Sequence, residues 1–206
     1  MKNSKRKTIL SDLIKIFRSE GQQINTNGKN KFFFIDTMLY ICNTLINDKS
    51  MNIFALDTDV KTASQYHVDK HIVKMPLETA QMLCTASWYC DLKAPYKPTH
   101  KKHPCNLWLL ESLDNYIWLC NLGIELCKEY TYRYGRKHGC EKVILECYVN
   151  FPNLPSKGLT PHALAMPNDC KISNNSVECY RKYYNEYKQH LFSWTKRDKP
   201  FFIKTL

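Results

Sequence analysis

Apolar residues recur at helical spacing through most of the chain beyond its first fifty residues. Residues 59–91 predict a helix that begins after an Asp59 N-cap and is kinked at Pro76. A second long helix is predicted over 104–135, starting with a proline in its first turn, and a shorter one over 141–148. The core-facing side of the second helix has the helical period and consists of Leu109, Leu113, Ile117, Cys120, Ile124 and Cys127.

The remaining segments carry turn and cap signals. Residues 52–57, NIFALD, are expected to be a buried extended lead-in or a strand, and the proline-containing stretches 92–104 and 150–169 to be loops. A last helix is predicted to start at Asn175, where Glu178 completes a capping-box pattern. The aromatic row of that helix favours core packing over base stacking and comprises Tyr180, Tyr184, Tyr187, Leu191 and Trp194. We therefore predict an all-α fold, a single helical domain with long helices and proline-rich loops.

The first fifty residues differ from the rest in composition. They are rich in Lys, Asn, Ile and Phe, and their apolar run over 32–46 is shorter than the roughly twenty residues that span a bilayer. No membrane segment is expected. We predict a helical core domain over 51–206, starting at Met51. Residues 1–50 would be a poorly defined N-terminal extension, either disordered or translated from an upstream start codon.

Charge and composition narrow the classes of function. The 206 residues carry a net charge of +11, which favours a polyanionic partner, most simply nucleic acid, over a basic protein with no specific partner. The chain has no GxGxxG motif and no P-loop, so glycine-rich nucleotide loops are excluded. Its ten cysteines are dispersed without a CxxC pair, a pattern typical of buried, reduced thiols in an intracellular, cytoplasmic protein. No protein partner is indicated.

Seven polar residues fall on one helical line because their spacing alternates three and four residues. The line runs through Ser64, His67, His71, Lys74, Glu78, Gln81 and Thr85. Two imidazoles, an amine, a carboxyl and an amide form the mixed set that marks a functional site, whereas a solvated face is usually dominated by Lys and Glu. The adjacent line is also polar, which keeps a solvated face open as the alternative.

Lys74 and Glu78 are the catalytic pair that this line suggests. A partly desolvated lysine can act as an imine-forming nucleophile, and a carboxyl four residues on can transfer protons. His67 or His71 would move protons beside them. Lys70 is the second choice of nucleophile, and the alternative to catalysis is an ordinary exposed ion pair.

The same histidines allow a different chemistry. His67 and His71, with His100 and His103 in the following loop, are ligand types of a His/carboxylate site for a divalent metal. The carboxylate would come from Asp57, Asp59 or Asp69. The HxxxH pair lacks the glutamate of HExxH, so no zinc-protease argument applies. We favour a protein without a cofactor and keep the divalent metal as the alternative.

Basic residues on either side of the second helix are the candidates for contacting phosphate groups. They are Lys97, His100, Lys101, Lys102, His103, Arg133 and Arg136. The first five lie in a loop that precedes a helix N-terminus, a location that favours anions.

Several strings between Met51 and about Arg197 resemble a family of largely uncharacterised proteins from phages and large DNA viruses. They are MNIFALDTDVKTASQYHVDKHIVKMPLETAQML, YKPTHKKHPCNLW, EYTYRYGRKH, ALAMPND and YRKYYNEYKQHLFSWTKR. That family is in turn distantly similar to the phage pyrimidine-dimer DNA glycosylases, small all-helical repair enzymes. The shared pattern is a helix with Gln65 and His67, then His103, Trp108, a long helix ending near Glu129 and Arg133-Tyr-Gly, and a terminal Tyr-Tyr helix.

The resemblance implies a glycosylase in the cytoplasm of a virus-infected cell that binds double-stranded DNA, flips a nucleotide and cuts the glycosidic bond through an imine. The glycosylases that this chain resembles use as their nucleophile the N-terminal α-amine that is exposed when the first methionine is removed. Here fifty residues precede Met51, and Asn52 does not normally promote that removal. The nucleophile is therefore not carried over, and Lys74 with Glu78 is our assignment from the polar line.

Three hypotheses follow. The leading one is a DNA-repair hydrolase, a base-excision enzyme of DNA glycosylase/AP-lyase type, that uses Lys74, Glu78, His67 and His71. The second is a metal-dependent phosphoesterase or nuclease that uses His67, His71 and Asp69 together with the loop that carries His100 and His103. The third is a non-catalytic nucleic-acid-binding viral protein, in which the polar line is solvated.

Overall fold

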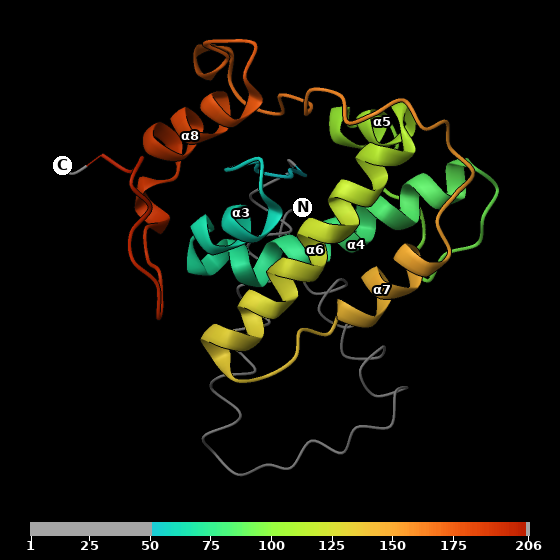
Figure 1. The fold of residues 1–206 in the computed structure, drawn as a ribbon, viewed down its shortest axis with the longest axis horizontal. Coiled ribbons are helices and arrows are strands. Elements are labelled where there is room, and N and C mark those ends of the chain that lie inside the picture. The colour runs from blue at the N-terminus through green and yellow to red at the C-terminus, as the bar shows by residue number, and fades with distance from the viewer. Residues whose placement is uncertain (1–50, 205–206) are drawn as a thin grey trace, which may run out of the picture. The chain divides into compact units, whose positions relative to one another are not determined.

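The computed structural model describes residues 51–204, and the predicted extension over 1–50 lies outside the described residues. Within 51–204 the chain forms α-helices and short 3₁₀ turns and has no strand, which confirms the all-α prediction for this part (Figure 1). The elements are α3 (Val60–Tyr66), α4 (Asp69–Tyr89), α5 (Pro104–Glu111), α6 (Leu113–Tyr134), α7 (Glu141–Val149), η1 (Asn168–Cys170), α8 (Ser176–Tyr187) and η2 (Gln189–Leu191). None of these helices has the length and apolar character needed to cross a membrane.

The first long helix of the prediction is two helices, because tertiary partners take its backbone hydrogen bonds. Asp59 caps α3 as predicted. In a continuous helix the Gln65 carbonyl would accept from the Asp69 N–H. Instead that carbonyl accepts from Arg133 Nη2 at 2.9 Å, and the Asp69 N–H donates to the Ser193 carbonyl at 2.9 Å. The two residues between the helices are extended as a result.

The second predicted long helix also divides, at Ser112, which ends α5 and caps α6. The Trp108 carbonyl, which a continuous helix would pair with the Ser112 N–H, accepts from the side-chain amide of Asn115 at 2.8 Å. α6 ends at Gly135 as predicted, where a φ of 69° suits glycine. α4 runs through Pro76 without interruption.

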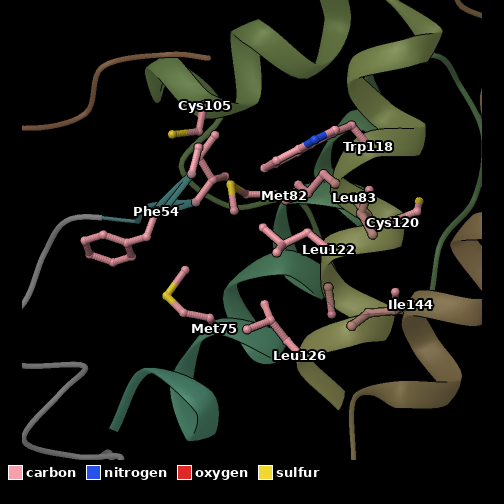
Figure 2. Close-up of a cluster of buried hydrophobic side chains, with 14 of the residues drawn as sticks. Phe54, Met75, Met82, Leu83, Cys105, Trp118, Cys120, Leu122, Leu126 and Ile144 are labelled. Carbon is pink, nitrogen blue, oxygen red and sulfur yellow. The ribbon is translucent and has the colours of Figure 1, made fainter. Parts of the chain in front are cut away.

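The core lies where α4, α6 and α7 pack together. Figure 2 shows side chains from all three helices meeting there, among them Met75, Leu83, Leu122, Leu126 and Ile144. Gly123 of α6 permits this approach: a Cβ added there would lie 2.6 Å from Thr79 Cγ2 and 3.1 Å from Ile144 Cδ1. A larger residue at this position requires the Thr79 and Ile144 side chains to shift.

The buried residues match the predicted faces only in part. Of the face expected on the second helix, Leu109, Cys120 and Cys127 are buried, whereas its other three members are half-buried. Residues 51–56 are a buried lead-in without strand structure. α8 starts after its Asn175 cap as predicted and buries the first two tyrosines of its aromatic row.

Candidate functional site

The polar line of α3 and α4 is largely buried, so its interpretation as a solvated face is wrong. Lys74 and Gln81 are half-buried, and the other five members are buried: Ser64, His67, His71, Glu78 and Thr85. The exposed side of these helices is the adjacent polar line, which includes Lys61 and Lys70. The chemically mixed groups therefore face the interior and contact other segments of the chain.

Lys74 and Glu78 form an ion pair that is almost withdrawn from solvent. Lys74 Nζ lies 2.9 Å from Glu78 Oε1, and the two side chains are 13% and 9% exposed. The other carboxylate oxygen, Oε2, accepts from the backbone N–H of Asn52 at 3.0 Å. Asn52 is itself held in place, since its side-chain amide donates to the Ala165 carbonyl at 2.8 Å. Each oxygen of Glu78 therefore has its own donor.

Cys105 lies close to Glu78, and Tyr180 lies next to Cys105. Burial raises the pKa of the Cys105 thiol to about 12, and the negative charge of Glu78 contributes to the rise. Tyr180, fully buried on α8, donates its hydroxyl to the Ala163 carbonyl at 2.7 Å. Sequence reasoning missed Asn52 and Cys105 as neighbours of Glu78, because they come from two other segments with no shared period.

The two histidines of the line are buried and neutral. His67 donates from Nδ1 to the Ala63 carbonyl at 2.7 Å, and burial lowers its pKa to about 4. His71 bonds through Nδ1 to the Tyr184 hydroxyl and stacks on Phe54, with ring centroids 4.4 Å apart. Burial, followed by the neighbouring His67, lowers the pKa of His71 well below its usual value. Neither imidazole is a ready general acid at neutral pH.

Asp69 does not join these histidines. Its carboxylate accepts from Arg133 Nη1 at 2.8 Å, from the Ser193 hydroxyl at 2.7 Å and from the Thr195 N–H at 3.0 Å. Burial raises the pKa of Asp69, but these hydrogen bonds outweigh burial and bring it below its usual value. The carboxylate is thus committed to a structural network.

The proposed metal ligands His67, His71 and Asp69 are not brought together. Among residues 51–204, the His, Cys, Asp and Glu side chains that gather three donor atoms within 4.8 Å of one another are Asp169, Cys170 and Glu186. Both carboxylates of that trio already have partners: the Tyr187 hydroxyl donates to Asp169 at 2.6 Å, and Lys182 pairs with Glu186 at 2.5 Å. This surface group gives no support to a metal site.

Arg133, predicted to contact phosphate, is instead buried, with an exposed fraction of 3%. Its Nε donates to Glu129 at 2.7 Å, while its two Nη groups donate to Asp69 at 2.8 Å and to the Gln65 carbonyl at 2.9 Å. Arg197 also pairs with Glu129, at 2.8 Å. We therefore assign Arg133 to the network that joins α6 to the α3–α4 junction, and not to a nucleic-acid contact.

The other basic candidates separate into two places. Lys97, His100, Lys101 and Lys102 are exposed in the loop between α4 and α5. His103 is half-buried and caps α5, where its Nδ1 accepts from the Cys105 N–H at 3.2 Å. Arg136 is exposed just beyond the C-terminal end of α6, and Figure 1 shows this end of α6 far from the loop between α4 and α5. Only the loop therefore forms a basic cluster of several of these residues.

Comparisons with protein-family models, with curated proteins and with solved structures find no match for this chain. A functional assignment therefore rests on the residues around Glu78 and on the resemblance of residues 51–197 described above. Within that stretch, the structure joins Gln65, Glu129 and Arg133 in one network and buries Trp108 in the core.

Proposed function

We propose that the protein is a DNA glycosylase/AP-lyase of the pyrimidine-dimer type, in which Lys74 is the nucleophile and Glu78 transfers the proton. One observation carries the proposal: the Lys74 amine lies 2.9 Å from the Glu78 carboxylate, and both side chains are almost withdrawn from water. A lysine in such surroundings can release its proton to a neighbour and then react as a neutral amine.

The proposed reaction balances with these two groups. Lys74 passes a proton to Glu78, and its neutral nitrogen bonds to C1′ of the sugar as the C1′–N bond breaks. The electron pair of that bond leaves with the base, which takes a proton from the alkylated amine. The nitrogen lone pair then opens the sugar ring to an imine, and O4′ takes the proton held by Glu78.

The surrounding residues have positioning roles in this proposal. The Asn52 N–H holds Glu78 Oε2, which leaves Oε1 directed at Lys74. His71 stays neutral because of its burial and holds the Tyr184 hydroxyl. We propose structural roles for His67 and His71 in place of the proton transfer considered from the sequence.

The resemblance to the phage glycosylases adds a second amine to be tested. The nucleophile of those enzymes is an N-terminal α-amine. In this chain the backbone nitrogen of Asn52 lies 3.0 Å from Glu78 Oε2. A chain that started at Met51 and lost that methionine would carry an α-amine at the same carboxylate. The nucleophile is therefore Lys74 or, in such a shortened chain, the amine of Asn52.

Borohydride trapping tests the proposal. The purified full chain is incubated with UV-irradiated or abasic duplex DNA in the presence of EDTA, and sodium borohydride reduces any imine to a stable adduct. We expect an adduct with the wild-type protein and with Lys70→Ala, an exposed lysine on the same helix. We expect none with Lys74→Arg, which keeps a cation beside Glu78 but does not form an imine at neutral pH.

Three other outcomes would contradict part or all of this proposal. An adduct that persists in Lys74→Arg assigns the nucleophile elsewhere, and mass spectrometry of the adduct peptide then identifies the amine. No adduct on either substrate, with DNA binding retained, rejects the lyase proposal and favours the non-catalytic nucleic-acid-binding protein. Cleavage that appears only after a divalent metal replaces EDTA favours the metal-dependent nuclease.

A further inference from the structure

Two consecutive aromatic side chains are exposed at the C-terminal end of α4. Trp88 is 38% exposed and Tyr89 is 43% exposed. Neighbouring residues of a helix point about 100° apart, so the two rings present separate surfaces and do not cover each other. Single exposed aromatics are common on protein surfaces, whereas an exposed pair beside a basic loop is typical of a binding surface.

Both rings are fixed to the loop that follows them. Trp88 Nε1 donates to the Tyr96 carbonyl at 2.9 Å, and the Tyr89 hydroxyl donates to the Lys101 carbonyl at 3.1 Å. The polar atom of each ring is thereby used within the protein, while much of its apolar surface remains in solvent. The rings are preorganised, so a ligand that stacks on them does not have to order them first.

The loop is also held from its other side. Thr85, the last residue of the polar line, donates its hydroxyl to the Gln81 carbonyl at 2.7 Å and accepts from the Thr99 N–H at 3.0 Å. The Asn106 side chain donates to the Thr99 and His100 carbonyls at 3.2 and 2.9 Å. Pro95 adds local stiffness, since its φ is restricted. Thr85 thus holds the loop in place.

The charge of this surface favours a polyanion. Residues 88–103 contain one acidic residue, Asp91. They also contain four exposed lysines, which are Lys93, Lys97, Lys101 and Lys102. The Lys101 ammonium lies over the Tyr89 ring, 5.8 Å from its centroid. A base stacked against these rings would therefore have cations close to its phosphate, which is the arrangement of sequence-tolerant single-strand binding sites.

We propose that Trp88, Tyr89 and the loop 91–103, together called the α4–α5 platform, bind single-stranded nucleic acid. Unpaired bases stack on the two rings, and the lysines neutralise the phosphates between them. Bases within a duplex are already stacked on their neighbours, so the rings select unpaired nucleotides. The proposal requires no catalytic role for Lys74.

Binding by the full chain in the Lys74→Arg background, where imine chemistry is blocked, tests the platform. The probes are a thymidine oligomer of about twelve nucleotides and an oligomer of equal length and charge that lacks bases. We expect tighter binding of the thymidine oligomer. Replacing both rings, by Trp88→Leu with Tyr89→Leu, should weaken that binding about 5-fold to 100-fold and remove the preference. Tyr148→Leu, which removes a 38% exposed ring on α7, should leave it unchanged.

A second measurement uses the wild-type rings. A thymidine oligomer carrying 5-iodouracil should photocrosslink to the peptide that contains Trp88 and Tyr89, even if the double variant fails to fold. Equal binding of both oligomers, unchanged binding by a folded double variant, or crosslinks confined to other peptides would each overturn the proposal. Equally tight binding of polyglutamate of the same charge would also overturn it and would favour an acidic protein partner.

Discussion

Acidification should destabilise the protein through His67, because its imidazole is buried in the neutral form. Nδ1–H donates to the Ala63 carbonyl, so an added proton must go to Nε2, a buried atom with no hydrogen-bond partner among residues 51–204. Burial accordingly lowers the pKa of His67 from an ordinary 6.5 to about 4. The unfolded chain regains the ordinary value, so folding and protonation compete.

The sign and size of the effect follow from these two pKa values. Between pH 6.5 and pH 4 the unfolded chain binds a proton at His67 that the folded chain does not, so stability falls as the pH falls. Through His67, the free energy of unfolding falls by about 2 kcal/mol between pH 7 and pH 5, and the decrease approaches about 3 kcal/mol below pH 4. Above pH 6.5 the contribution is fully present.

Urea unfolding followed by circular dichroism at pH 7 and pH 5 measures this loss. His67→Leu should lose about 2 kcal/mol less than the wild type between the two pH values, because leucine does not titrate. The hydrogen bond to Ala63 is missing at both pH values and cancels in the comparison. An identical loss in His67→Leu and the wild type would refute a buried, neutral His67.

Two further predictions concern packing and the buried charges. Gly123→Ala should lower the free energy of unfolding by about 1 kcal/mol, since overpacking against Thr79 outweighs the better helix propensity of alanine. Gly139→Ala, where a Cβ meets open space, is the matched control in the same urea titration. Arg133→Ala should lose about 3–5 kcal/mol, because it leaves buried acceptors unpaired, whereas the exposed Arg136→Ala should change stability by less than about 0.5 kcal/mol. A small loss in Arg133→Ala would contradict its assignment to the network.

Local signals in the sequence were sufficient for the type and many of the ends of the helices. Asp59 and Asn175 cap helices because their side chains reach backbone N–H groups two or three residues away. Gly135 ends α6 because it adopts a left-handed backbone at little cost. Each of these effects acts within one turn of the chain, so the sequence contains all of its participants.

The interruptions within the two long helices could not be predicted in that way. The segments 59–91 and 104–135 have helical periodicity throughout, and each break depends on a distant partner. The α3–α4 break requires the guanidinium of Arg133 and the carbonyl of Ser193. A hydrogen bond lost by the helix is regained from a residue more than sixty positions away, and periodicity carries no information about that exchange.

At the candidate site, too, the sequence identified the residues but not whether they are buried or exposed. The polar line identified Lys74 and Glu78 from their spacing, but an exposed ion pair and a buried one have the same spacing. What distinguishes them is the backbone of Asn52, which is packed over Glu78 by the buried lead-in. Arg133 is the opposite case. A basic residue in a basic chain suggests a phosphate contact, but in the fold three protein acceptors already bind the Arg133 guanidinium. A basic side chain is therefore a phosphate contact only where the fold has not already paired its charge with carboxylates, and that criterion favours the exposed lysines of the α4–α5 platform over Arg133 as the nucleic-acid contact.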